Sequence, residues 1–373
     1  MNHVLHIINR LDRERGSTTW LASMLISMND PLIKHFVVST SKLSGTRENE
    51  FITNGIDVIH IPLNFLNPIP YCISLYNLIK SKKIDIVQSH MGWLGAYDTL
   101  IALFAGIKSR IIYFHSGDWL HAGSILHRFG ALFFTLLGRI TATHFSAGSE
   151  DALKRWLPGH HLMPQRCIVV SSGIKFHDFS NFDLTAQRAS MGIPDDALVV
   201  GHVGRLTPEK NHITILQACF QLLKQHSSMH LVIIGDGPEK NKLEAFCQEN
   251  SIDNRVHFLG VRTDVRECMK AMDVFILPSL FESYGMVALE AQDAGTRLMA
   301  SNITVLDTLV SPLWQNFRFD PEKPDEIISQ FPLIMKMPKN RPDEFLEKHR
   351  LSDSIDKLAK FYRLLGTAEG KEG

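Results

Sequence analysis

The 373-residue chain is short of several features that mark whole classes of protein. It has five cysteines, which are scattered and form no C-x-x-C pair. That pattern argues against a disulfide framework and against a zinc site, and it indicates reduced, buried thiols in a cytosolic protein. The formal net charge is zero, so no excess of basic charge points to nucleic acid as a partner.

Long hydrophobic runs are also missing. The first residues, MNHVLHIINRLDRE, do not have the shape of a signal peptide. No uninterrupted apolar run reaches the ~18–20 residues that a membrane-spanning helix needs, and the nearest, FGALFFTLLGRI at 129–140, is too short. This run is typical of a core helix, and a helix lying against a membrane surface is the alternative. We expect a cytoplasmic protein, and peripheral attachment to the cytoplasmic face of the membrane stays open.

What the sequence does have is a regular alternation of short apolar runs with longer amphipathic ones. The length suggests about two domains at ~150 residues each. The strand-like runs lie at 3–8, 35–39, 57–61, 84–88, 110–114, 143–147, 198–204, 230–235, 255–260, 273–278 and 297–301. Strands that alternate with helices predict an α/β fold, in which a parallel sheet has helices on both faces.

The alternation weakens between residues 173 and 196, and we interpret this segment as a linker that leads into a helix and a turn. The predicted division is a first domain at 1–172, a linker at 173–196, a second domain at 197–350, a C-terminal helix at 351–365 and a disordered tail at 366–373. In open α/β sheets, ligands bind beyond the carboxyl ends of the strands. Functional residues are therefore expected just after the predicted strands.

One candidate motif is GHVGRLTPEKN at 201–211. Gly204 permits a tight turn at the end of a strand, and Pro208 is suited to open a helix. Arg205 and Lys210 place two cations beside that helix end, which makes a phosphate site. The alternative is an ordinary solvated surface loop. A second stretch, IIGDGPEKNKLE, places Gly235 after another strand, but a glycine pair alone is a weak signal and also fits a plain turn.

The stretch PSLFESYGMVALEAQDAG at 278–295 has two glutamates, Glu282 and Glu290, with seven residues between them. A helix is predicted to begin around Tyr284–Gly285, so its first N–H groups, from Ser283 to Val287, can bind an anion. Carboxylates accept hydrogen bonds from hydroxyl groups, so one glutamate could hold a ribose and the other a sugar. The alternatives are a surface glutamate on a helix for Glu290 and a cap-like residue for Glu282.

Three residues of the first half also follow strands. His115, in IIYFHSGDW, is placed to point into a cleft between the domains, and a structural histidine is the alternative. His90, in VQSHMGW, is a weaker candidate of the same kind. Gly16 precedes a helical run after the first strand, which gives another helix N-terminus.

Taken together, these motifs resemble the retaining glycosyltransferases of family 4. The segments GRLTPEKN, GDGPEK, VHFLG, DVFILPSLFESYGMVALEAQDAG and MAS come in that family's order and spacing. The resemblance covers about residues 1–310. Within the family, the chain is most similar to bacterial enzymes of exopolysaccharide and lipopolysaccharide synthesis. The resemblance implies the GT-B architecture, in which two Rossmann-like domains face each other across a deep cleft.

The resemblance implies a role for each matching residue. Arg205 and Lys210 would bind the donor diphosphate and stabilise it as the leaving group. Glu290 would hold the nucleotide ribose, Glu282 would contact sugar hydroxyls, and His115 would lie by the reacting sugar. Catalysis would thus rest on His115, Arg205, Lys210 and Glu282. Further contacts to the nucleotide-sugar would come from Gly16, Gly204, Gly235, Leu259, Ser283, Tyr284, Gly285, Met286 and Val287.

The implied activity is that of a hexosyltransferase. It would move a sugar from a UDP- or GDP-linked donor to a glycan or lipid-linked acceptor in polysaccharide synthesis, with no metal and no other cofactor. The sequence has no Asp-x-Asp, which agrees with a metal-free site. Residues 1–170 have 16 Lys and Arg against 11 Asp and Glu, a bias that suits an anionic membrane surface or substrate unless it is chance.

Some positions depart from the family pattern and keep alternatives open. The first-domain loop RERGSTTW lacks the usual paired glycines, Asp293 and Thr296 stand where small residues are commoner, and 302–320 lacks expected glycines. A catalytically weak protein that binds a nucleotide-sugar or a partner, and a nucleotide-sugar epimerase, are therefore alternatives. A dinucleotide-dependent oxidoreductase is disfavoured, because no G-x-G-x-x-G follows the first strand.

Overall fold

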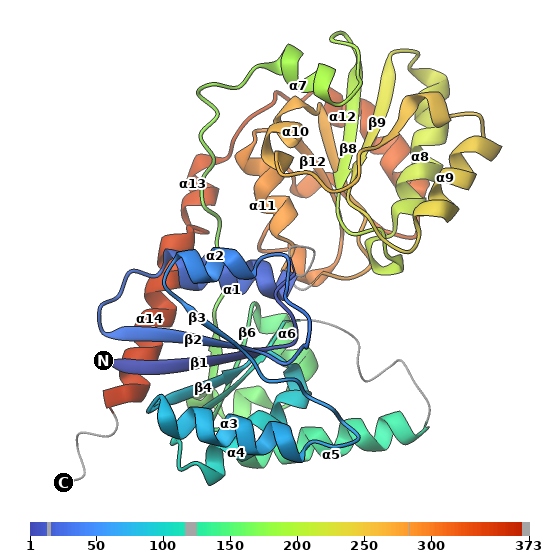
Figure 1. The fold of residues 1–373 in the computed structure, drawn as a ribbon. Coiled ribbons are helices and arrows are strands. Elements are labelled where there is room, and N and C mark those ends of the chain that lie inside the picture. Colours follow the sequence, from blue (N-terminus) through green and yellow to red (C-terminus); the bar gives the residue numbers. More distant parts are fainter. Residues whose placement is uncertain (13–15, 116–124, 283, 368–373) are drawn as a thin grey trace. The chain divides into compact units, whose positions relative to one another are not determined.

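The computed structural model describes residues 1–12, 16–115, 125–282 and 284–367 (Figure 1). The chain divides into two compact units, Met1–Gly173 with Leu351–Gly373, and Ile174–Arg350. Each unit is built on one sheet whose paired strands are all parallel, with helices around it (Figure 1). The predicted α/β class is confirmed.

The first unit has a seven-stranded sheet in the order β3-β2-β1-β4-β5-β6-β7. Its strands are β1 (Asn2–Ile8), β2 (Ile33–Ser39), β3 (Asp57–His60), β4 (Ile86–Ser89), β5 (Ser109–Phe114), β6 (His144–Ala147) and β7 (Cys167–Val169). Its helices are α1 (Gly16–Ser27), α2 (Glu48–Thr53), α3 (Ile69–Ser81), α4 (Ala96–Phe104), α5 (Ile125–Thr141), α6 (Glu150–Trp156) and α14 (Leu351–Thr367). Side chains of α1 and α14 share one core layer, and those of α3 and α4 share another.

The second unit has a six-stranded sheet in the order β10-β9-β8-β11-β12-β13. Its strands are β8 (Leu198–Val203), β9 (Met229–Ile234), β10 (Val256–Phe258), β11 (Val274–Leu277), β12 (Arg297–Ser301) and β13 (Arg318–Phe319). Its helices are α7 (Leu184–Ser190), α8 (His212–Gln225), α9 (Lys240–Glu249), α10 (Val265–Ala271), α11 (Met286–Asp293), α12 (Pro324–Met335) and α13 (Asp343–Glu347).

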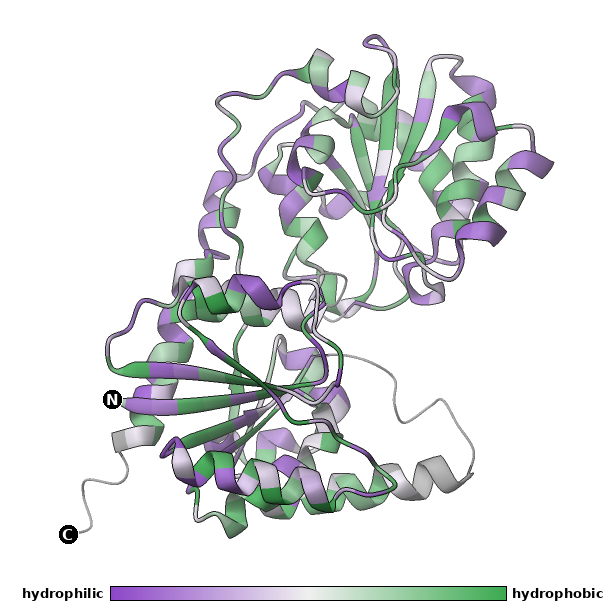
Figure 2. Ribbon diagram, in the orientation of Figure 1, coloured by the Kyte–Doolittle hydropathy of each residue, from purple (hydrophilic) through white to green (hydrophobic). Residues whose placement is uncertain are grey.

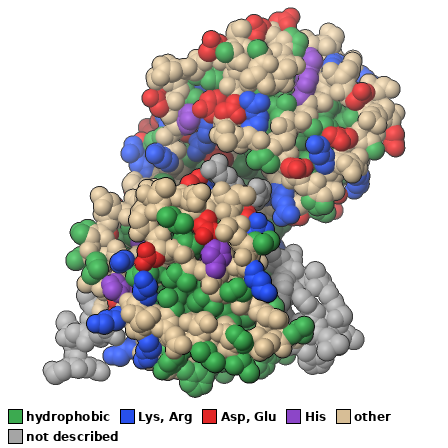
Figure 3. Space-filling model, in the orientation of Figure 1, with side chains coloured by type: hydrophobic (Ala, Val, Ile, Leu, Met, Phe, Trp, Pro, Cys, Tyr) green, Lys and Arg blue, Asp and Glu red, His purple; other side chains and the backbone are tan. Residues whose placement is uncertain are grey.

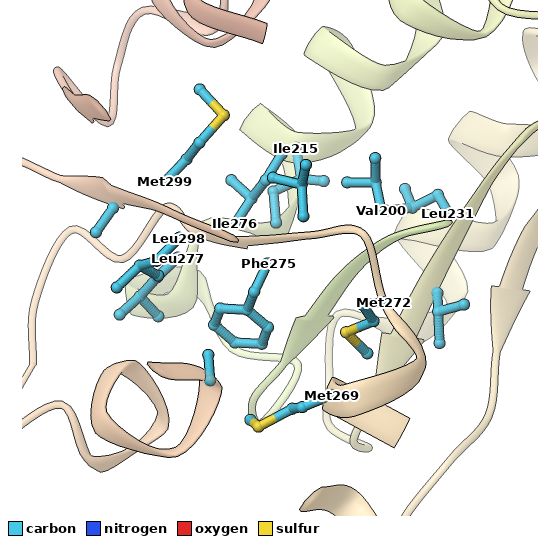
Figure 4. Packing of buried hydrophobic residues seen from close by; sticks show 14 of the residues in the cluster. Val200, Ile215, Leu231, Met269, Met272, Phe275, Ile276, Leu277, Leu298 and Met299 are labelled. Carbon is cyan, nitrogen blue, oxygen red and sulfur yellow. The ribbon is translucent and has the colours of Figure 1, made fainter. Parts of the chain in front are cut away.

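The central strands of both sheets are largely apolar on both faces, because helices cover each face of a parallel sheet. Figure 2 shows these strands as mostly hydrophobic. In the second unit, Val200, Leu231 and Phe275 come from three neighbouring strands and lie in one core with Ile215 of α8 (Figure 4). All four are fully buried, so this sheet is a rigid platform for the loops at its carboxyl edge.

All eleven predicted strand-like runs coincide with observed strands within a few residues. The two observed strands that the sequence analysis did not identify are β7 and β13. Each is at most three residues long and lies at one end of its sheet. Such short edge strands carry too few residues for an apolar period to be recognised.

The predicted linker at 173–196 is ordered structure of the second unit, which begins at Ile174. Its helix α7 is N-capped by Asp183, whose side chain accepts a hydrogen bond from the backbone N–H of Ala186, and α7 lies against α10. The predicted C-terminal helix is α14, which belongs to the first unit because Tyr362 and its neighbours cover the sheet there. Most of the predicted disordered tail, 368–373, lies outside the described residues, and 366–367 end α14.

The apolar run at 129–140 forms most of α5, and it is not simply a core helix. Gly138 lies against the ring of Trp93, which fixes one side of the helix to the first unit. Leu132, Phe133, Leu136 and Ile140 are all more than half exposed. Within the described ranges, no helix is long and apolar enough to cross a membrane.

Candidate active site

In the second unit, the carboxyl edge of the sheet is formed by loops that follow β8, β9 and β11. The loop after β8 and the loop after β9 are joined through their backbones. The N–H of Gly204 donates to the carbonyl of Ile234 at 2.9 Å, and the N–H of Leu206 donates to the carbonyl of Asp236 at 3.0 Å. The two predicted glycine motifs therefore form one structural feature.

Gly235 explains why these loops can meet. Its φ is +138°, a conformation that residues with a side chain rarely adopt, and a Cβ there would lie 2.0 Å from the carbonyl oxygen of Gly204. A Cβ on Gly237 would lie 2.4 Å from the carbonyl oxygen of Leu206. These glycines thus allow a close backbone approach between the two neighbouring loops.

The structure joins two predicted site residues in an ion pair. The Nζ atom of Lys210 lies 2.6 Å from Oε1 of Glu282. Glu282 is only 7% exposed and also accepts a hydrogen bond from the hydroxyl of Ser279 at 2.7 Å. Arg205, in the same loop as Lys210, is exposed, and no ion pair joins it to any of the described residues. The loop thus presents one fixed cation and one accessible cation.

Helix α11 begins after Gly285, as predicted. Gly285 has a φ of +86°, and a Cβ there would lie 2.6 Å from a methyl group of Leu306, so the turn into the helix requires glycine. The backbone N–H groups of Met286 and Val287 occupy the first turn, where no preceding helical carbonyl can accept from them. Tyr284 is buried next to this turn. The predicted contact residue Ser283 lies outside the described residues.

Glu290 is half-buried on α11, and its Oε1 lies 3.5 Å from Nε of Arg266 in α10. Arg266 also binds the fully buried Asp293 at 2.7 Å. Asp293 accepts further hydrogen bonds from the backbone N–H of His177 at 3.0 Å and from Arg341 at 2.8 Å. The unexpected aspartate is therefore neutralised by two arginines, and it fixes the segment after Ile174 to α11.

Arg266 is a neighbour of Glu290 that the sequence did not indicate. It lies in the run VRECMK, which contains no recognisable motif. It belongs to the candidate site only because it pairs with Glu290 and Asp293 in the folded chain. Leu259, which the resemblance placed by the base, follows β10 and is half-buried, and its N–H donates to the carbonyl of Ile233 at 2.9 Å.

The remaining predicted residues belong to the first unit. Gly16 is the first residue of α1, and a Cβ there would have no described atom within 4 Å. His115 directly follows β5 and is half-buried. Its Nε2 lies 2.8 Å from Nδ1 of His90, which the sequence analysis rated as the weaker histidine candidate.

The pair of His90 and His115 is the end of a longer row of imidazoles. Nε2 of His90 lies 3.2 Å from Nδ1 of His6, and Nε2 of His6 lies 3.1 Å from Nδ1 of His35. The row runs from β2 through β1 to the residues after β4 and β5, which are neighbours in the sheet order. Burial lowers the pKa of His35 to about 4 and that of His115 to about 3, and it holds the pKa of His6 and His90 well below 6.5.

This imidazole row predicts acid sensitivity of the first unit. In the unfolded chain each ring takes up a proton near pH 6.5, whereas the folded rings stay neutral down to about pH 4. As pH falls below 6.5 the unfolded state binds more protons, so stability is lost by up to about 1.4 kcal/mol per pH unit for each ring. Urea unfolding between about pH 4 and pH 7 should show this slope. His35→Phe should reduce it, and His161→Phe at an exposed position should not.

Comparisons with known proteins relate this chain to glycosyltransferases. Residues 183–350 match the family described as glycosyl transferases group 1. EpsF of Bacillus subtilis (strain 168), a protein named as a glycosyltransferase, is 26% identical over 303 residues, which is 80% of this chain and 79% of EpsF. The UDP-Gal:alpha-D-GlcNAc-diphosphoundecaprenol alpha-1,3-galactosyltransferase of Escherichia coli is 24% identical over 336 residues, covering 84% of this chain and 85% of that enzyme. The group 1 family is therefore shown for residues 183–350, and the chain is a glycosyltransferase by its likeness to these enzymes.

Solved structures support the same fold for this glycosyltransferase. Anabaena Alr3699/HepE, in complex with UDP-glucose, matches with a TM-score of 0.79 at 17% identity, covering 97% of this chain and 99% of that one. A glycosyltransferase from Rickettsia africae ESF-5 matches with a TM-score of 0.80 at 15% identity, covering 98% of each chain. The architecture is therefore GT-B, as the resemblance implied.

Proposed function

We propose that this glycosyltransferase is a retaining hexosyltransferase that moves a sugar from a UDP- or GDP-linked donor to a glycan or lipid-linked acceptor of a cell-surface polysaccharide. The observation that carries the proposal is the ion pair of Lys210 with the buried Glu282, in the unit that also contains the start of α11 at Gly285. Support also comes from the Escherichia coli relative, whose name specifies UDP-Gal and a diphosphoundecaprenol acceptor, and from the complex of HepE with UDP-glucose.

Within this proposal, the donor diphosphate binds between the cationic loop and the start of α11. Lys210 and Arg205 neutralise its charge, and the N–H groups of Met286 and Val287 donate to its oxygens. The same groups stabilise the charge that develops on the leaving nucleoside diphosphate, and this stabilisation is the main way in which they raise the rate. We propose that the site needs neither a metal ion nor another cofactor.

The two carboxylates then have separate roles. When Lys210 also binds the phosphate, it interacts less strongly with Glu282. Glu282 can then accept hydrogen bonds from sugar hydroxyls, while the hydroxyl of Ser279 holds its carboxylate in place. Glu290 accepts from the ribose hydroxyls, and Arg266 limits the motion of its carboxylate. Neither carboxylate is needed as a nucleophile, because in this mechanism the acceptor attacks from the face that the phosphate leaves and a phosphate oxygen takes its proton.

A thermal-shift panel of nucleoside diphosphates and nucleotide-sugars, with EDTA present, tests the donor site. A ligand that binds the folded state raises its apparent stability by mass action, so one nucleotide should raise the melting temperature and identify the base. NMR of the product with a matching acceptor should show the donor's anomeric configuration retained. Isomerised donor without acceptor would favour an epimerase, and a shift without turnover would favour a binding protein. No shift with any nucleotide would overturn the proposal.

We further propose that the first unit binds an anionic membrane surface through α5. Its exposed apolar side chains are accompanied by Leu103 and Phe104 of α4, which are 41% and 75% exposed. Figure 3 shows hydrophobic side chains gathered along the lower edge of this unit, where Figure 1 draws α3, α4 and α5. Exposed apolar side chains on a unit with a basic bias suit a helix lying in the headgroup region.

This membrane proposal predicts co-sedimentation with anionic liposomes at low salt. Leu136→Gln, which places a polar group on the exposed face of α5, should reduce the bound fraction several-fold. Leu333→Gln, a matched change at an exposed position of α12 in the second unit, should not. Absence of binding by the wild type, or equal binding by all three proteins, would contradict the proposal.

A further inference from the structure

The row of four histidines crosses a largely apolar layer of the first unit. His35, His6 and His90 are each less than 9% exposed, and they lie among side chains of α1 and α14. Tyr362 of α14 contacts the rings of His6 and His35 edge-on at 6.0 and 6.2 Å between centroids. Apolar side chains could fill the same positions, so the presence of four histidines there needs a separate explanation.

A neutral imidazole has one N–H donor and one bare nitrogen that accepts. Each of the four rings uses one nitrogen toward each neighbour in the row, so the position of the proton on one ring dictates its position on the next. Only two arrangements satisfy all three histidine–histidine contacts: every ring protonated at Nε2, or every ring protonated at Nδ1. The buried rings are neutral near pH 7, which keeps the row within these two arrangements.

The inner end of the row distinguishes the two arrangements. Nε2 of His35 lies 3.3 Å from the sulfur of Met28. A thioether sulfur accepts hydrogen bonds and cannot donate, so this contact favours a proton on Nε2 of His35. The arrangement with Nε2 protonated then propagates through His6 and His90 to His115.

Gln88 also contacts the row. Its amide nitrogen lies 3.4 Å from Nε2 of His90, and its amide oxygen accepts from the hydroxyl of Tyr362 at 2.8 Å, an orientation that favours a bare Nε2 on His90. A half-turn of the amide presents its oxygen to His90 and its NH2 group to Tyr362, whose hydroxyl can accept. The sulfur of Met28 cannot exchange an acceptor for a donor in this way. It therefore decides which nitrogen of each ring carries the proton.

We propose that Met28, His35, His6 and His90 are positioning residues that fix His115 with its proton on Nε2 and its Nδ1 bare. His115 then donates to His90 and keeps Nδ1 as a hydrogen-bond acceptor. No hydrogen bond joins that Nδ1 to another residue that the structure describes. If His115 lies by the reacting sugar, which rests on the proposed function, Nδ1 accepts from a hydroxyl of the donor sugar or of the acceptor.

The test is long-range proton–nitrogen NMR of the histidine rings in the full-length, nitrogen-15-labelled protein near neutral pH. All four rings should show a protonated Nε2 and a bare Nδ1, with the signal of His115 assigned by its loss in His115→Phe. Met28→Leu should introduce the other tautomer in all four rings together. Met24→Leu, a matched change at a buried position of α1, the helix that ends just before Met28, should leave the spectrum as in the wild type. A protonated Nδ1 in wild-type His115, or an unchanged Met28→Leu spectrum, would overturn the proposal.

Kinetics separate this inference from the proposed function. Met28→Leu should lower kcat several-fold while leaving the Kd for the nucleotide donor unchanged, since the phosphate-binding groups belong to the second unit. Wild-type kcat in Met28→Leu would overturn the catalytic part of the inference. A wild type that binds no nucleotide-sugar would refute the proposed function, whereas the tautomers would still be decided by the NMR measurement.

Discussion

Lys210→Ala is expected to weaken binding of the nucleotide-sugar donor by roughly 10- to 150-fold, because a hydrogen bond to a charged group contributes about 1.5–3 kcal/mol. Lys210 is the fixed cation of the site, held 2.6 Å from Glu282. Isothermal titration with the nucleotide found in the thermal-shift panel measures the change. Lys242→Ala is the matched control, since that side chain is 68% exposed on α9 and pairs only with Glu239 among the described residues.

A second variant separates the loss of the phosphate contact from a side effect. Lys210→Ala alone leaves the buried carboxylate of Glu282 without its cation, which destabilises the loop. The double change Lys210→Ala with Glu282→Gln removes that charge, and donor binding should still be weak. Wild-type affinity in either folded variant would show that Lys210 does not contact the donor.

Asp293→Ala is expected to lower the free energy of unfolding by about 3–5 kcal/mol, the usual cost of breaking a buried salt bridge by removing one partner. Arg266 and Arg341 would each lose a short ion pair, and the N–H of His177 would lose its acceptor. Urea unfolding followed by circular dichroism measures the effect, which should appear in the transition of the second unit.

The control for this prediction is Asp343→Ala. Asp343 also pairs with Arg341, at 2.7 Å, but its side chain is 67% exposed. An exposed ion pair contributes only about 0–1 kcal/mol, so this change should be nearly neutral. Equal destabilisation by the two changes would mean that burial of the Asp293 cluster is not what holds the segment after Ile174 in place.

Several local features were predictable because their causes are local. An apolar run bounded by turn residues forms a buried strand wherever the strand lies in the sheet, and eleven such runs were identified. The turn into α11 was predictable for the same reason, since Gly285 adopts a φ of +86° that favours glycine. The spacing of Glu282 and Glu290 likewise follows from one turn and one helix.

Other features depend on which strands become neighbours in the sheet. The order of the strands along the chain does not determine their order in the sheet. The sheet order β3-β2-β1-β4-β5 brings His35, His6, His90 and His115 into one row, although the contacting pair His6 and His90 is 84 positions apart in the chain. Arg266 became part of the site only because α10 lies beside α11.

The sequence by itself thus determined the α/β class, the positions of the principal strands and the motifs of the proposed donor site, because periodicity and backbone conformation act over a few residues. Only the tertiary structure decided that the segment after Ile174 belongs to the second unit and that α14 returns to the first. It also decided that Asp293 is neutralised by two arginines. These outcomes depend on burial and charge pairing between segments that are far apart in the sequence. Such interactions form only when folding brings the segments together and removes them from water.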